Sequence, residues 1–117
     1  MPRPRRDEMP ALYLTTLEQE LLSLLTGREL YSVEIERAFS EVVGRKRNFG
    51  SFYPTLRKLE KQGLLSARWG DEEPEERGGP RRRYYKTTVL GADALKEAQR
   101  RREDLRDWKL APEGGRA

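Results

Sequence analysis

The chain has 117 residues, of which 38% are charged and 35% hydrophobic, and its formal net charge is +4. This length fits one domain with a modest core, and the low apolar fraction favours burial of further surface in a dimer. Because the sequence contains neither cysteine nor histidine, it excludes disulfides, thiolate or imidazole zinc sites and histidine-based catalysis, so neither a cofactor nor an enzymatic role is expected.

Residues 1–10 contain three prolines and three arginines without an apolar period. They are predicted to form a flexible basic arm, which either follows DNA or has no role. No apolar run in the sequence is long enough to span a membrane, so no membrane partner is expected. The lack of cysteine suits a reducing compartment, and the expected localisation is cytoplasmic.

The first two helices are indicated by apolar residues at helical spacing. The first is predicted over residues 12–25, where Thr15 and Glu18 have the spacing of a capping box. The second is predicted to open with Ser32 as its N-cap and to end at Gly44. Its buried side is expected to consist of Val33, Ile35, Ala38, Phe39 and Val42.

A third helix is predicted to begin near Ser51, because Pro54 fits only a first turn and Phe52, Leu56 and Leu59 recur on one face. Gly63 is expected to end it. The opposite face is small at its start and cationic along its length, which suits entry into the major groove of DNA. An ordinary amphipathic helix with a solvated basic face is the alternative.

Two strands and a long helix complete the pattern. Residues 64–69 alternate in polarity and 81–88 are rich in tyrosine, so they are predicted to form a hairpin around the loop 70–80. Thr88 is a suitable N-cap for a last helix that runs to about Lys109.

The predicted fold is therefore mainly α within the α+β class: a winged helix-turn-helix with an additional long C-terminal dimerisation helix. The winged-helix DNA-binding domain is expected over residues 11–88 and the dimerisation helix over 89–110. Residues 111–117 are predicted to be a tail.

The fold would bring together cations from three separate parts of the sequence, which favours a polyanionic partner. These are Arg45, Lys46 and Arg47 before the third helix, Arg57, Lys58 and Lys61 on it, and Arg81, Arg82 and Arg83 on the hairpin. The acidic run at 71–76 is expected to turn away from DNA. Its carboxylates lie in an exposed loop with nothing to shift their pKa, which argues against acid–base catalysis.

The sequence GSFYPTL at residues 50–56, followed by Leu-Glu at 59–60 and GLL at 63–65, resembles the signature of PadR-type transcriptional regulators. The stretch GPRRRYY at 79–85 and the TVLG segment at 88–91 are similar to the wing and the last helix of that family. Three residues depart from the usual pattern: Ser51 replaces threonine, Ser32 replaces glycine and Thr87 replaces leucine.

The resemblance implies a dimeric winged-helix repressor whose last helices pair, with Tyr53 and the arginine-rich hairpin in contact with double-stranded DNA. Base readout is assigned to Ser51, Thr55, Arg57 and Lys58, and backbone positioning to Tyr53 and to the basic clusters at 45–47 and 81–83. Tyr53 could instead pack beneath the hairpin. The alternative function is a winged helix that binds an acidic protein partner.

A homodimer on a pseudo-palindromic operator is expected, because the last helix carries an apolar stripe longer than the domain beneath it. The expected interface residues are Leu14, Leu17, Leu95, Ala98, Leu105 and Trp108. Trp108 is also the candidate contact for a small aromatic effector, with simple capping of the dimer core as the alternative.

Overall fold

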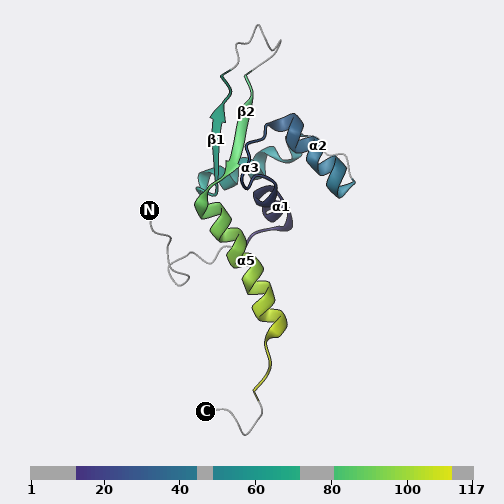
Figure 1. Ribbon diagram of the computed structural model, residues 1–117, viewed down its shortest axis with the longest axis vertical. Helices are drawn as coiled ribbons and strands as arrows, with labels where there is room; N and C mark the ends of the chain where they lie inside the picture. Colours follow the sequence, from purple (N-terminus) through teal and green to yellow (C-terminus); the bar gives the residue numbers. More distant parts are fainter. Residues whose placement is uncertain (1–12, 45–48, 72–80, 112–117) are drawn as a thin grey trace.

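The computed structural model describes residues 13–44, 49–71 and 81–111. Three helices are followed by a hairpin and one long helix, which confirms the predicted winged helix-turn-helix of the α+β class (Figure 1). The elements are α1 (Thr16–Leu24), α2 (Ser32–Val43), the 3-10 turn η2 (Phe49–Ser51), α3 (Tyr53–Lys61), β1 (Leu65–Trp69), β2 (Arg83–Thr87) and α5 (Val89–Asp107).

The predicted capping box is present at the start of α1. The Thr15 hydroxyl accepts a hydrogen bond from the Glu18 backbone N–H at 3.1 Å, and the Glu18 carboxylate accepts one from the Thr15 N–H at 2.7 Å. The helix therefore begins at Thr16 rather than at residue 12.

The predicted cap of α2 is wrong by one residue. Tyr31 is the N-cap and Ser32 is already helical, because the Tyr31 N–H is satisfied by the Glu34 carboxylate at 3.1 Å. Gly44 ends α2 in the left-handed conformation, as predicted.

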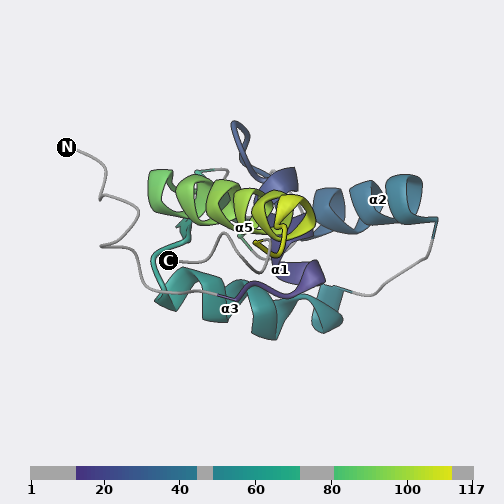
Figure 2. The same ribbon diagram turned by 90° about the horizontal axis from the view of Figure 1, so that it is seen from below.

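The core lies where α1, α3 and the hairpin meet. Phe52, Leu56 and Leu59 of the predicted apolar face are all fully buried, and the Phe52 ring lies 4.7 Å from that of Phe39 on α2. In Figure 2, α1 lies between α3 on one side and α5 on the other. The first helix therefore supports both the short helix α3 and the long helix α5.

Two residues expected on the buried side of α2 are exposed. Ile35 and Phe39 enter the core, but Val33 is half exposed and Val42 is 84% exposed. Helix α2 thus packs through a narrow stripe, and Val42 lines a groove between α1, α2 and α5.

The hairpin is antiparallel, with Leu65 opposite Thr87 and Trp69 opposite Arg83. A single bridge between Leu30 and Tyr85 adds the connection after α1 to its edge, with N–H···O distances of 3.1 and 2.9 Å. The buried Thr87 hydroxyl donates to the Leu22 carbonyl at 2.8 Å, so this residue joins β2 to α1.

Close backbone approach fixes the start of α5. A Cβ atom at Gly91 would overlap the carbonyl oxygen of Leu64, which follows α3. The Thr88 hydroxyl caps α5 by accepting from the Gly91 N–H at 3.0 Å, as predicted, and it donates to the Gly63 carbonyl at 2.6 Å.

Along the described part of the chain, no helix has the length and apolarity required to cross a membrane.

Candidate nucleic-acid interface

The outer face of α3 is the cationic surface that the sequence predicted. With Leu56 and Leu59 buried, helical geometry turns Arg57, Lys58 and Lys61 outward, and all three are exposed. Ser51 is exposed in η2, whereas Thr55 is partly buried. Arg45, Lys46 and Arg47 lie outside the described residues, as does the N-terminal arm.

Tyr53 is the first residue of α3, and it is 42% exposed. Its hydroxyl accepts a hydrogen bond from Arg57 Nη1 at 3.3 Å, and the Arg57 guanidinium carbon lies 5.8 Å from the ring centre. The hydrogen bond with Tyr53 raises the pKa of Arg57. The pair presents one donor fork and one phenol at the start of α3.

Lys58 has a different environment from its neighbour. Its ammonium lies 2.9 Å from the Glu18 carboxylate of α1, whose side chain is only 4% exposed. The cation at the middle of α3 is therefore already paired with a buried carboxylate in the protomer.

The three arginines of the hairpin have different partners, and only Arg83 belongs to β2, whereas Arg81 and Arg82 come directly before it. Arg83 lies on the side of α3, where it pairs with Glu60 at 3.0 Å and stacks 4.9 Å from the Trp69 ring. Arg82 lies 4.4 Å from the ring of Tyr31. Arg81 donates to the Gly70 carbonyl at 2.9 and 3.3 Å. Arg83 is thus joined to α3 by an ion pair.

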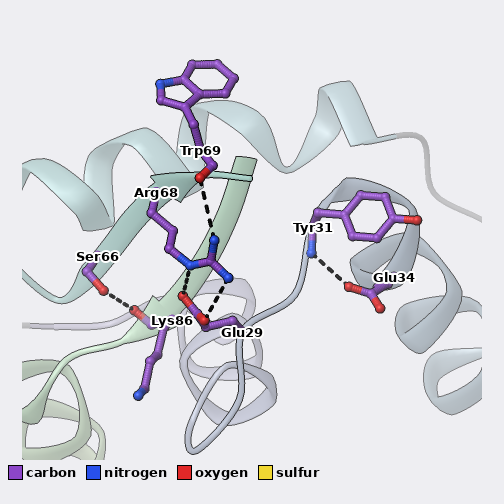
Figure 3. A network of polar contacts seen from close by, with 7 residues as sticks. All are labelled: Glu29, Tyr31, Glu34, Ser66, Arg68, Trp69 and Lys86. Atoms are coloured by element: carbon purple, nitrogen blue, oxygen red, sulfur yellow. Dashed lines mark hydrogen bonds and ion pairs between the residues drawn. The ribbon is translucent and has the colours of Figure 1, made fainter. Parts of the chain in front are cut away.

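A polar network that the sequence did not indicate joins β1 to the connection between α1 and α2 (Figure 3). Arg68 of β1 forms a two-pronged pair with Glu29 at 2.8 and 3.1 Å, and it stacks 4.7 Å from the Tyr84 ring. The Tyr84 ring lies 5.6 Å from that of Tyr31. The Arg68 pair lowers the pKa of Glu29, chiefly through the hydrogen bond. The sequence predicted that Arg68 lies in a strand, but it gave no sign of the partner Glu29.

The residues expected at a dimer interface fall into two groups. Leu95 and Ala98 are buried within the protomer, and Leu14 and Leu17 pack partly against the core, so little of Leu95 or Ala98 remains for a partner to cover. Leu105 and Trp108 are 72% and 68% exposed at the far end of α5, which extends beyond the other helices (Figure 1). Leu110 is exposed beside them.

A groove of about 670 Å³ runs between α1, α2 and α5. Its apolar wall comes from Leu24, Phe39, Val42, Val43 and Leu95, and polar residues such as Gln19 and Arg102 line its other side. No cluster of carboxylates suited to a metal ion occurs among the residues that the structure describes.

Comparison with known proteins agrees with this geometry. The model of a family described as the transcriptional regulator PadR-like family matches residues 21–97. No functionally curated protein matches the chain.

Solved structures with the same fold include the following three. A PadR-like transcription factor from Bacteroides fragilis is 30% identical, with 78% of this chain and 84% of that chain covered and a TM-score of 0.68. A PadR family regulator from Eggerthella lenta is 29% identical, with coverages of 79% and 76% and a TM-score of 0.65. Bacillus subtilis PadR in complex with operator DNA is 23% identical, with coverages of 88% and 55% and a TM-score of 0.59.

Proposed function

The chain belongs to the PadR-like family of transcriptional regulators, and from this membership and the geometry of α3 we propose that it is a sequence-specific DNA-binding repressor. The observation that carries the proposal is the outer face of α3, which is small at Ser51 and cationic at Arg57 and Lys61. A helix with these properties can enter the major groove, where arginine can read guanine through two hydrogen bonds.

Arg57 is the residue best placed for base readout. It lies one turn into α3, next to the exposed Tyr53 hydroxyl, and it has no ion pair with any described residue. Tyr53 is proposed to contact the phosphate backbone beside it. Ser51 and Thr55 are the other candidate readers, with Thr55 the weaker because it is partly buried.

The hairpin is proposed to contact the backbone through Arg83 rather than equally through all three arginines. Arg83 lies on the α3 side of the hairpin, and its partner Glu60 keeps about a third of its side chain exposed. A solvated carboxylate can release its arginine to a phosphate at little cost. The other proposed phosphate contacts are Lys61, Arg81, Arg45, Lys46 and Arg47.

We propose that the protein acts as a homodimer. The apolar end of α5 extends past its own domain, while an apolar groove remains open between α1, α2 and α5. Seating the end of one α5 in the groove of a second copy would bury Leu105, Trp108 and Val42 together. A twofold dimer requires a pseudo-palindromic operator with half-sites about 34–36 Å apart.

The test is fluorescence anisotropy with duplexes selected from a random pool and with a scrambled control, across a range of salt concentrations. Arg57→Ala should cost about 1–3 kcal/mol on the selected duplex and much less on the scrambled one. Arg83→Ala should weaken binding to both alike and reduce the log–log salt slope by about 0.9 per lost phosphate contact, whereas Arg82→Ala should have little effect.

Equal losses on both duplexes for Arg57→Ala would remove it from base readout. A protein that selects no duplex and instead binds acidic proteins in competition with heparin would favour the winged helix as a protein-interaction module. Repression is tested separately, with a reporter gene placed behind the selected operator.

A further inference from the structure

Glu18 carries a charge in an unusual place for this domain. The residue is 3% exposed, on the side of α1 that packs against α3. Burying a carboxylate is costly unless it is both hydrogen-bonded and paired with a cation. The Thr15 N–H donates to one oxygen at 2.7 Å, and the Lys58 ammonium lies 2.9 Å from the other. Both requirements are therefore met: the hydrogen bond comes from Thr15 of the same helix, and the paired cation comes from Lys58 of α3.

The α1 side of this contact is held in place by several bonds. Thr15 and Glu18 cap the helix reciprocally. The next residue, Gln19, donates to the Leu14 carbonyl at 3.0 Å and accepts a hydrogen bond from Arg102 of α5. The carboxylate is therefore held at a fixed position on α1, and Lys58 of α3 pairs with it there.

We propose, building on the DNA-binding function above, that Glu18 is a positioning residue for DNA recognition, and that Lys58 acts through this buried ion pair and not through a phosphate or a base. The pair links the middle of α3 to α1 and so fixes the rotation of α3 about its own axis. Because Arg57 is adjacent to Lys58 on the helix, that rotation sets the direction in which Arg57 meets the base edges.

The contrast with Arg83 explains why Lys58 stays in place. If Arg83 leaves Glu60, water can reach the released carboxylate, since about a third of its side chain is exposed. If Lys58 left Glu18, a charge with 4% exposure would remain buried without its counterion. A phosphate therefore competes poorly for Lys58.

Lys61 is the matched control. It lies three residues further along α3, is exposed, and has no ion pair with any described residue. A lysine that contacts phosphate contributes about 0.9 to the log–log salt slope, per protomer, when it is lost. Lys61→Met shows what the loss of a free lysine does, and Lys58→Met shows what the loss of a paired one does.

The experiment measures binding of full-length wild type, Lys58→Met, Lys61→Met, Glu18→Gln and the double variant Glu18→Gln/Lys58→Met to selected and scrambled duplexes across salt concentrations. Lys58→Met should leave the salt slope unchanged but reduce the preference for the selected duplex roughly tenfold. Glu18→Gln should reduce that preference similarly and steepen the slope, because Lys58 is released to the phosphates. The added slope should disappear in the double variant.

A flatter slope for Lys58→Met, by about 0.9 per protomer, would overturn the inference and make Lys58 an ordinary phosphate contact. An unchanged preference in both single variants would overturn it as well. Thermal melting distinguishes a loss of stability from a loss of recognition. Lys58→Met should lower the Tm in the wild-type background but not in the Glu18→Gln background. A wild-type protein that distinguishes no duplex would instead refute the proposed function and, with it, this role of Glu18.

Discussion

At the scale of single residues, the Glu18 carboxyl ties stability to pH. Burial of the carboxyl raises its pKa, but the Thr15 N–H and Lys58 outweigh this effect, so the pKa lies below the ordinary glutamate value. A carboxyl with a lowered native pKa binds protons more readily in the unfolded chain. Its contribution to stability is therefore complete above the unfolded pKa of about 4.3, and it is lost as the pH falls through the lowered native pKa.

Urea unfolding between pH 3 and pH 7 measures this dependence. The Glu18→Gln variant should be less stable than wild type at pH 7 and should lose less stability on acidification. Glu29→Gln is the control, since the pKa of Glu29 is also lowered but the residue is exposed, and solvent weakens its pair with Arg68. Equal acid sensitivity of wild type and Glu18→Gln would contradict this view of Glu18.

Residue contacts were predictable from the sequence only where they are local. The capping box of Thr15 and Glu18 follows from a spacing of three residues, and it was correctly predicted. The second partner of Glu18, Lys58, comes from another helix, and no spacing encodes that meeting. Thr87 illustrates the same limit: its departure from the usual leucine gave no sign that its hydroxyl would satisfy the Leu22 carbonyl.

At the scale of elements, the junction between α3, β1 and α5 depends on Gly91. Helix α5 approaches Leu64 so closely that a Cβ atom at Gly91 would overlap the Leu64 carbonyl oxygen and crowd the Thr87 side chain. Backbone atoms cannot move away as a flexible side chain can. The contact therefore fixes where α5 leaves the domain.

Gly91→Ala is expected to destabilise the protein by about 3 kcal/mol or more, measured by urea unfolding. The expected loss is opposite in sign to the usual effect, because replacing glycine by alanine within a helix normally increases stability. Lys96→Ala, at an exposed position of the same helix, should change stability by less than about 0.5 kcal/mol. A Gly91→Ala variant as stable as wild type would show that α5 can shift without cost.

The element order was predictable because each element carries its own period. Phe52, Leu56 and Leu59 mark one face of α3 correctly. The prediction for α2 failed at Val33 and Val42 because periodicity shows which residues share a face but not how much of that face is covered. The contact of Arg68 with Glu29 joins residues 39 positions apart and could not be predicted.

At the scale of the whole molecule, α5 has more apolar surface than one protomer can cover. Its first half is buried through Gly91, Ala94, Leu95 and Ala98, whereas the exposed residues at its end have no cover from the described part of the same protomer. The groove beside Val42 and Val43 has the opposite deficit, an apolar wall without an occupant among the described residues. A second copy would remove both deficits at once.

Leu105→Asp is therefore expected to shift the protein from dimer to monomer at micromolar concentration. Operator binding should weaken by more than tenfold, because a monomer contacts only one half-site of the palindrome. Sedimentation velocity and anisotropy give the two readouts. Arg106→Ala is the control on the same turn. A wild-type monomer that binds the palindrome tightly would contradict the dimer.

Trp108, which is 68% exposed as the C-cap of α5, is the proposed contact for a small-molecule effector. In the proposed dimer this indole lies among apolar residues from two copies, where a flat aromatic compound could stack on it. An effector must bind the free and the DNA-bound dimer with different affinity, since a ligand with equal affinity for both shifts no equilibrium. The alternative is that Trp108 only fills the dimer interface.

A Trp69→Phe background leaves Trp108 as the only indole, and phenylalanine keeps a ring beneath Arg83. Planar aromatic and cationic compounds are titrated with and without operator. An effector should quench Trp108 emission and weaken the operator complex at least tenfold, equivalent to about 1.4 kcal/mol of coupling. Trp108→Leu, which keeps an apolar side chain, should retain the dimer and lose the response. Quenching without any change in operator affinity would leave Trp108 as an interface residue with no role in sensing.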